Sequence, residues 1–194
     1  MKRKHIITIV LLLLPFCGAF AQKVSFSTNI SDWAYLGTVN LEASLGVSQH
    51  FSISVGGKLN PWEFQDNRRD VVVRDKRKTV NFGARYWPWY VYSGWWASLK
   101  GQYEIRQTNC VWRPALEESS AVGGVLSAGY AIMLGKHLDI DFGAGLFAGR
   151  YLDYTLYRCD DCAVIRQQGA RNFLRLDDIM VSISFIFLCH EILQ

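Results

Sequence analysis

The sequence has little that could form a membrane helix and little that would interrupt a sheet. After residue 21, no stretch approaches the ~18 uninterrupted apolar residues that a transmembrane helix requires. Only four prolines occur in 194 residues, whereas 50% of the residues are hydrophobic and 14% are aromatic. This composition favours strands over helices. Any membrane crossing by this chain must therefore be made of strands.

The chain also lacks a strong excess of charge once its first residues are set aside. Lys2, Arg3 and Lys4 are three of the 21 basic residues, which leaves 18 basic residues against 17 acidic ones. A nearly balanced charge gives no reason to expect a nucleic-acid partner.

The N-terminal residues have the pattern of an export signal. The basic residues at 2–4 are followed by a short apolar stretch at 6–16, and Ala19-Phe20-Ala21 places small residues where signal peptidase requires them. We therefore expect residues 1–21 to be a signal peptide and residues 22–194 to form a single domain.

Alternation of apolar and polar residues dominates the rest of the chain. It occurs in eight segments, each close to the ~9–11 residues that a tilted strand needs to cross a membrane. These segments are residues 24–31, 39–48, 51–60, 79–88, 95–106, 122–134, 138–149 and 179–187. Eight strands is the smallest usual number for a closed bacterial barrel, and lipid cannot satisfy an open sheet edge. The sequence therefore predicts an all-β fold, an up-and-down, eight-stranded antiparallel transmembrane β-barrel.

The connections between these segments alternate in length. Short turns are expected at 48–50, 91–93 and 135–137, and longer loops at 32–38, 63–78, 107–121 and 150–178. Short turns on one rim and long loops on the other are typical of outer-membrane barrels, in which the short turns are periplasmic. The even number of strands then predicts that both termini are periplasmic, in the outer membrane of a Gram-negative bacterium.

Aromatic residues gather near the expected rims, as they do in the girdles of membrane barrels. Those predicted to form the periplasmic girdle are Tyr86, Trp87, Trp89, Tyr90, Tyr92, Trp95 and Trp96. Those predicted to form the outer girdle are Trp62, Phe64, Tyr151 and Tyr154.

A soluble barrel of the lipocalin type, with apolar side chains pointing inward around a ligand, is the alternative fold. The polar positions of the strands distinguish the two, because they carry both acids and bases. We predict ion pairs inside the lumen among Glu42, Lys58, Arg85, Lys100, Glu104, Arg106, Asp139 and Asp141. Such a set suits a narrow polar lumen better than an apolar ligand cavity.

The chain contains six short sequence motifs whose order and spacing are moderately specific. They are Thr28-Asn29 with Asp32, Asn40-Leu41-Glu42, Asn60-Pro61-Trp62, Ala84-Arg85-Tyr86-Trp87, Gly135-Lys136-His137, and Tyr157 with Cys159 and Cys162. In these pieces the chain resembles a Bacteroidetes family of small outer-membrane β-barrels classed as a domain of unknown function. The resemblance implies an eight-stranded barrel that is fimbria-associated in some genomes, with no established activity and no functional residues to carry over. The chain departs from the family after Phe187, where similar proteins tend to end.

The pair Cys159 and Cys162 is the sharpest local chemical feature. An exported chain meets an oxidising compartment, so we predict a small disulfide clip, with a redox pair or a metal site as alternatives. No second CxxC and no nearby histidine completes a zinc site, so we expect no metal and no cofactor. Cys110 and Cys189 fall on opposite sides of the predicted barrel, too far apart to bond to each other.

Enzymatic activity and a pore are the functional alternatives to an anchor. Barrel enzymes that modify lipopolysaccharide usually need a histidine near the outer leaflet as a general base. His50, His137 and His190 instead map to the periplasmic rim, so we expect no catalytic residues. The interior of an eight-stranded barrel is only wide enough for side chains, which argues against a pore.

Six basic residues in one predicted outer loop could contact lipopolysaccharide phosphates. They are Arg68, Arg69, Arg74, Lys76, Arg77 and Lys78, and the acids Glu63, Asp66, Asp70 and Asp75 are interleaved with them. The interleaving favours an ordinary solvated loop of mixed charge. We therefore expect a structural or surface-interaction role in contact with outer-membrane lipid and lipopolysaccharide, with a surface or fimbrial protein as a further candidate partner.

Overall fold

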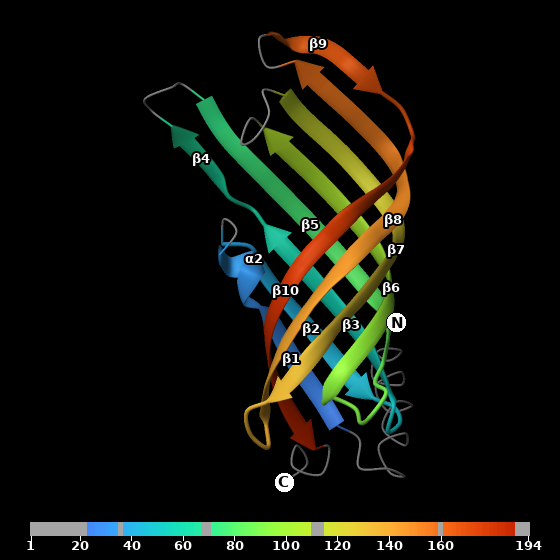
Figure 1. Cartoon of the computed structure of the whole chain (residues 1–194). Coiled ribbons are helices and arrows are strands. Elements are labelled where there is room, and N and C mark those ends of the chain that lie inside the picture. The colour runs from blue at the N-terminus through green and yellow to red at the C-terminus, as the bar shows by residue number, and fades with distance from the viewer. Residues whose placement is uncertain (1–22, 35–36, 67–70, 110–114, 159–160, 189–194) are drawn as a thin grey trace, which may run out of the picture.

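The computed structural model describes residues 23–34, 37–66, 71–109, 115–158 and 161–188. The predicted signal peptide, residues 1–21, lies outside them. The described chain forms one antiparallel sheet that closes into a barrel (Figure 1). The barrel strands are β1 (Lys23–Asn29), β2 (Val39–Gly46), β3 (Phe51–Asn60), β5 (Val71–Tyr86), β6 (Gly94–Asn109), β7 (Ala115–Met133), β8 (Leu138–Arg158) and β10 (Asn172–Leu188). Because β10 pairs with both β8 and β1, each of these strands has a neighbour on both sides, and the predicted eight-stranded fold is confirmed.

Three further elements lie in the connections. The short helix α2 (Ile30–Ala34) follows β1, while β4 (Glu63–Asp66) pairs with β5 and β9 (Asp161–Gln168) pairs with β8. Among the described residues, no helix has both the length and the apolar character that a membrane crossing requires.

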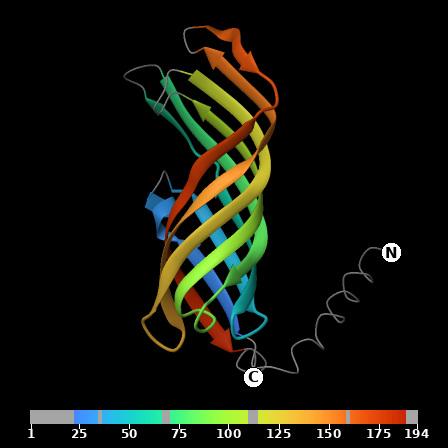
Figure 2. The same ribbon diagram turned by 45° about the vertical axis from the view of Figure 1, so that its right-hand side comes forward.

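The two rims of the barrel differ (Figures 1 and 2). The connections at 47–50, 87–93 and 134–137 lie at one rim, which we call the turn end. The first residue of β1 and the last of β10 pair with each other there, Lys23 with Leu188. The opposite rim, which carries β4 and β9, is called the loop end.

The strands are far less equal in length than the sequence predicted. β1 has 7 residues and β2 has 8, whereas β7 has 19 and β8 has 21. Much of the predicted loops at 63–78, 107–121 and 150–178 is therefore strand, and these three predictions are wrong. The cause is that a ladder needs only paired backbone groups. Where a strand continues with polar residues on both faces, no hydrophobic alternation marks it.

The period of two sorts the side chains into an apolar outer face and a largely polar interior. The most exposed apolar side chains point outward from every part of the wall and include Leu41, Val80, Phe82, Leu99, Leu126 and Ile179. Inside, two buried apolar clusters lie near the two rims. Charged and polar side chains fill the space between these clusters.

The prediction of one periplasmic aromatic girdle is wrong for three of its seven members. Trp87, Tyr92 and Trp96 are buried inside the barrel at the turn end, whereas Tyr86, Trp89, Tyr90 and Trp95 are exposed outside. The reason is register. Trp87 continues the inward positions of β5, and Trp96 continues those of β6.

The residues of the predicted outer girdle likewise differ in whether they lie outside or inside the barrel. Trp62 is exposed, but Tyr151 and Tyr154 are buried in the lumen, where they pack with Phe147 and Phe173. A β-bulge in β8 shifts the register beside Tyr151, because Ser120 pairs with Asp153 and Ala121 pairs with Tyr151, which leaves Leu152 as the extra residue. The side chain of Phe64 lies outside the described ones.

Candidate functional site

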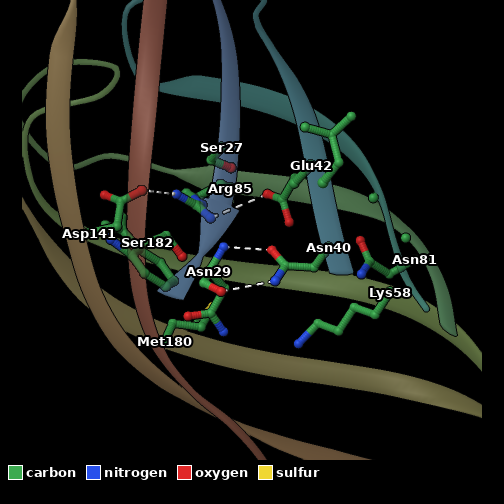
Figure 3. Close-up of a pocket in the computed structure, with 14 residues that line it drawn as sticks. Ser27, Asn29, Asn40, Glu42, Lys58, Asn81, Arg85, Asp141, Met180 and Ser182 are labelled. Atoms are coloured by element: carbon green, nitrogen blue, oxygen red, sulfur yellow. Dashed lines mark hydrogen bonds and ion pairs between the residues drawn. The ribbon is translucent and has the colours of Figure 1, made fainter. Parts of the chain in front are cut away.

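A belt of charged side chains crosses the middle of the lumen (Figure 3). Arg85 from β5 lies between two acids, with its Nη1 3.3 Å from Asp141 Oδ2 and its Nη2 3.4 Å from Glu42 Oε1. Lys100 Nζ donates to the other oxygen of Glu42. All four side chains are at most 19% exposed. Charges this far from water are stable only when they are paired, so the belt holds four strands of the wall in one register.

Arg85 also connects this belt to the aromatic cluster at the turn end. Its guanidinium carbon lies 4.2 Å from the ring centre of Trp96 and 5.4 Å from that of Trp87. A guanidinium over an indole face is attracted by the ring quadrupole. The same side chain thus neutralises two acids and covers two indoles.

A second charged group, which we call the Glu104 cluster, lies nearer the loop end. Glu104, whose side chain is 2% exposed, accepts from Arg77 at 3.1 Å and from Arg175. Arg77 is also 3.9 Å from Asp177. In the same cluster, Arg106 lies 3.7 Å from Asp75 and donates to Thr108. The members come from β5, β6 and β10, so the group ties together strands that are distant in the sequence.

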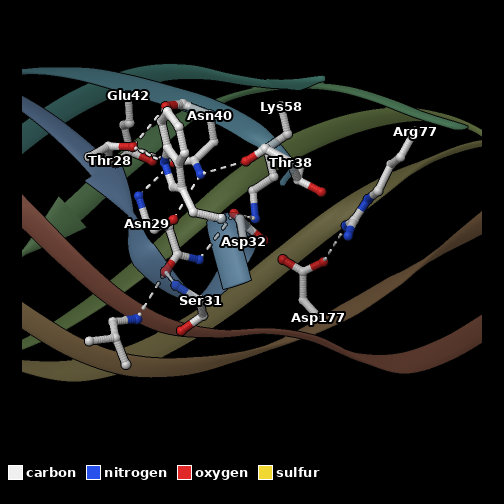
Figure 4. A network of polar contacts seen from close by, with 12 residues as sticks. Thr28, Asn29, Ser31, Asp32, Thr38, Asn40, Glu42, Lys58, Arg77 and Asp177 are labelled. Carbon is white, nitrogen blue, oxygen red and sulfur yellow. Dashed lines mark hydrogen bonds and ion pairs between the residues drawn. The ribbon is translucent and has the colours of Figure 1, made fainter. Parts of the chain in front are cut away.

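A third group of polar side chains closes the ends of β1 and β2 (Figure 4). Lys58 Nζ is 2.9 Å from Asp32 Oδ2, and Asp32 also accepts from the Asn29 side chain at 3.1 Å. Asn40 donates to the backbone carbonyl of Asn29 at 2.9 Å and accepts from the backbone N–H of the same residue. Asn29 Oδ1 accepts from the N–H of Val181 on β10 at 3.0 Å. Side chains therefore satisfy backbone groups where the strand ladder stops.

The structure brings most of the predicted lumen residues together, although not always with each other. Glu42, Arg85, Lys100 and Asp141 share the belt. Lys58, Glu104 and Arg106 pair instead with residues outside the predicted lumen set, which are Asp32, Asp75, Arg77 and Arg175, and Asp177 joins them through Arg77. Those residues fell in predicted loops. Every second residue of β5 points inward. Counting back from Thr79 in steps of two would therefore have placed Arg77 and Asp75 inside the barrel.

Asp139 is the exception in the predicted set. It is 1% exposed and lies inside the barrel near the turn end. Among the described residues, neither of its carboxylate oxygens has a hydrogen-bond partner.

A cavity of about 40 Å³ lies beside the belt, lined by Asn81, Arg85 and Asp141 among others (Figure 3). A water molecule needs roughly 10–15 Å³ of such space. The cavity therefore holds a few water molecules at most.

The connection at 87–93 closes the turn end from inside. Trp87 donates its indole N–H to Ser52 Oγ at 3.1 Å, and the Tyr92 hydroxyl lies 3.1 Å from Ser44 Oγ. Burial raises the pKa of Tyr92 to about 12. Tyr92 has a positive φ of 64°, which turns its ring back into the mouth of the barrel. The tight turn predicted at 91–93 is present, since the Ser93 N–H donates to the Tyr90 carbonyl at 3.1 Å. The buried side chains of the whole connection also make it a stopper for the turn end.

Two turn histidines have a defined structural contact. His50 Nδ1 lies 3.0 Å from the carbonyl oxygen of Trp87, and His137 Nδ1 lies 3.0 Å from that of Ile186. Since a carbonyl only accepts, each Nδ1 is the donor. His50 thus ties its turn to the residue that follows β5, and His137 ties its turn to the end of β10. His190 lies outside the described residues.

The predicted anion contacts do not all lie on the outer face of the barrel. Lys76 and Lys78 lie at outward positions of β5, whereas Arg77 points into the lumen and binds Glu104, so Arg77 is not an anion contact of an outer loop. The side chains of Arg68, Arg69 and Arg74 lie outside the described ones.

The predicted disulfide of Cys159 and Cys162 also lies outside the described side chains, as do Cys110 and Cys189, so it stays a prediction. Across the part of the chain that the structure describes, no group of histidine, cysteine and acidic side chains could hold a metal ion.

These features define the class of protein: a narrow, closed antiparallel β-barrel with an apolar outer face and an interior filled by paired charges. Residues 6–187 match the family model described as "Protein of unknown function (DUF3575)". The chain belongs to this family. No curated protein and no solved structure matches it.

Proposed function

We propose that the chain is an integral outer-membrane β-barrel of a Gram-negative bacterium, exported by a signal peptide, with both termini in the periplasm. The observation that carries the proposal is the inversion of the usual burial pattern. Leu99 and Phe82 are 65% and 62% exposed on the outer face, while Glu104 is 1% exposed inside. Soluble proteins rarely expose a large contiguous apolar surface, and charged residues are rarely buried unless paired. Hydrocarbon on the outside accounts for both features.

The barrel acts as an anchor rather than a passage. Its cross-section is occupied by the Arg85 belt, and its turn end is covered by Trp87 and Tyr92. Opening a path would require breaking buried ion pairs, which is costly. These contacts favour the structural role over a small pore.

A non-catalytic role is part of the same proposal. The two described turn histidines are engaged with backbone carbonyls at the turn end, far along the barrel from the loop end where an outer-leaflet substrate would bind. A lipopolysaccharide-modifying activity remains the alternative. Incubation of the purified barrel with lipopolysaccharide, followed by mass spectrometry of the lipid, tests it.

The loop end is the proposed surface for partners. β7 and β8 are about twice as long as the ~9–11 residues that a crossing requires. Their extra length would raise the β8–β9 hairpin above the membrane, where it could meet a surface or fimbrial protein. Lys76 and Lys78 on the outer face of β5 are placed to contact lipopolysaccharide phosphates.

Fractionation and heat-modifiability test the membrane location. We expect the mature chain to fractionate with the outer membrane, to need detergent for solubility, and to migrate faster on a gel before boiling than after it. Solubility without detergent would contradict the proposal. A matched control is the boiled and rapidly cooled sample, which should migrate as the unfolded chain.

A further inference from the structure

The wall of the barrel has a step beside β10. β10 pairs with β8 over residues 172–185 but with β1 only over 182–188, because β1 ends at Asn29. Next to the end of that ladder, the Val181 N–H donates to the side chain of Asn29. Residues 172–180 of β10 therefore have no partner strand on that side among the described residues, and we call them the free edge. The helix α2 packs beside the lower part of β10 (Figure 1).

This free edge lies within the apolar outer face. Leu174, Leu176 and Ile179 point outward from it and are 70%, 59% and 62% exposed. Leu174 is the most exposed large apolar residue among those described. Lipid cannot hydrogen-bond the backbone, so an unpaired edge at this depth is unfavourable unless another molecule supplies donors and acceptors. A ligand with one polar and one apolar end would suit this edge, because its polar end could hydrogen-bond the backbone while its apolar end contacts the exposed side chains.

The interior side of the same segment has the complementary chemistry. Arg175 lies between Leu174 and Leu176 and Asp177 follows Leu176, and both point inward and belong to the Glu104 cluster. This cluster is more open than the middle belt, since the side chains of Arg175 and Arg106 are 23% and 30% exposed, against 11% for Arg85. It contains three acids and three bases, which are Asp75, Glu104, Asp177, Arg77, Arg106 and Arg175. Such a balanced set favours an uncharged head group that both donates and accepts hydrogen bonds over a phosphate.

We propose that the free edge of β10 binds a glycolipid of the outer leaflet. The hydroxyl and amide groups of its head would hydrogen-bond the unpaired backbone, and its acyl chains would lie along Leu174, Leu176 and Ile179. This inference rests on the proposed membrane location.

Photo-crosslinking from two matched positions tests the proposal. Leu176 or Leu126 is replaced by p-benzoylphenylalanine in the mature chain, which is reconstituted in phosphatidylcholine vesicles containing a minor fraction of glucosylceramide. Leu126 is the control because it is 61% exposed on the outer face of β7, which is paired on both sides. One net hydrogen bond corresponds to roughly a two- to tenfold change in a binding constant. We expect glucosylceramide to be enriched by that order at position 176 over position 126.

Other outcomes separate the two proposals. No lipid adduct at either position would overturn the membrane location together with this inference. Equal glucosylceramide adducts at both positions would overturn the inference alone. A second vesicle with phosphatidylglycerol in place of glucosylceramide would overturn the uncharged head group if that lipid were the one enriched. Should the first variant fail to show heat-modifiability, the pair Leu174 and Leu99 serves in the same way, at 70% and 65% exposure.

Discussion

Replacing Glu104 by glutamine is the most direct test of the paired interior. Glu104→Gln keeps the size of the side chain, so it creates almost no cavity, but it removes the charge that Arg77 and Arg175 share. Removing one partner of a buried ion pair costs about 3–5 kcal/mol, because the remaining charge stays buried. Arg77 retains Asp177 at 3.9 Å, so we expect the lower end of that range.

The expected loss converts into a measurable shift of the unfolding midpoint. With urea slopes of roughly 1–3 kcal/mol per molar, a loss of about 3 kcal/mol lowers the midpoint by about 1–3 M. The folded fraction can be followed in detergent by the mobility of unboiled samples. Glu118→Gln is the control, since Glu118 lies at an outward position of β7, and it should change stability by less than about 0.5 kcal/mol.

A second substitution checks the mechanism. Adding Arg175→Met to Glu104→Gln removes one of the two arginine charges that Glu104 neutralises in the original protein. The double variant should therefore regain part of the lost stability. If Glu104→Gln shifts the midpoint no more than Glu118→Gln does, the charged interior does not stabilise the barrel and the reasoning fails.

Three further substitutions test other contacts by the same urea assay. Trp87→Ala should cost about 3–5 kcal/mol because Trp87 is 0% exposed in the stopper, whereas Trp89→Ala, at 60% exposure, should change little; equal effects would contradict the inward assignment. Gly83→Ala should cost about 1–3 kcal/mol, since its Cβ would lie 2.2 Å from the Leu99 carbonyl oxygen, while the Cβ of Gly101→Ala meets nothing closer than 3.8 Å and should be tolerated. His50→Ala should cost about 1 kcal/mol through the lost contact with the Trp87 carbonyl, and a neutral result would show that the turn holds without it.

Local pattern was enough to predict the eight barrel strands and the two faces of their central segments, but not the full lengths of the strands. The alternation in 39–48 and 51–60 placed Glu42 and Lys58 on the inner face, and both are inside. The reason is that side chains alternate across a strand whatever its neighbours are. The same rule, carried a few residues further along β5, would have placed Trp87 inside the barrel instead of in a girdle.

The tertiary structure alone decided which side chains meet. Glu104 binds Arg77 and Arg175, which are 27 and 71 residues away in the sequence, and this pairing depends on how the closed sheet is staggered. The tertiary structure also decided where β1 ends against β10, which leaves the step beside β10. The sequence determined by itself the number of strands and the inner and outer faces, because these follow from a period of two residues within each segment. The partners of each inward charge required the closed barrel, because closure joins β10 to β1 and fixes the register of every strand between them.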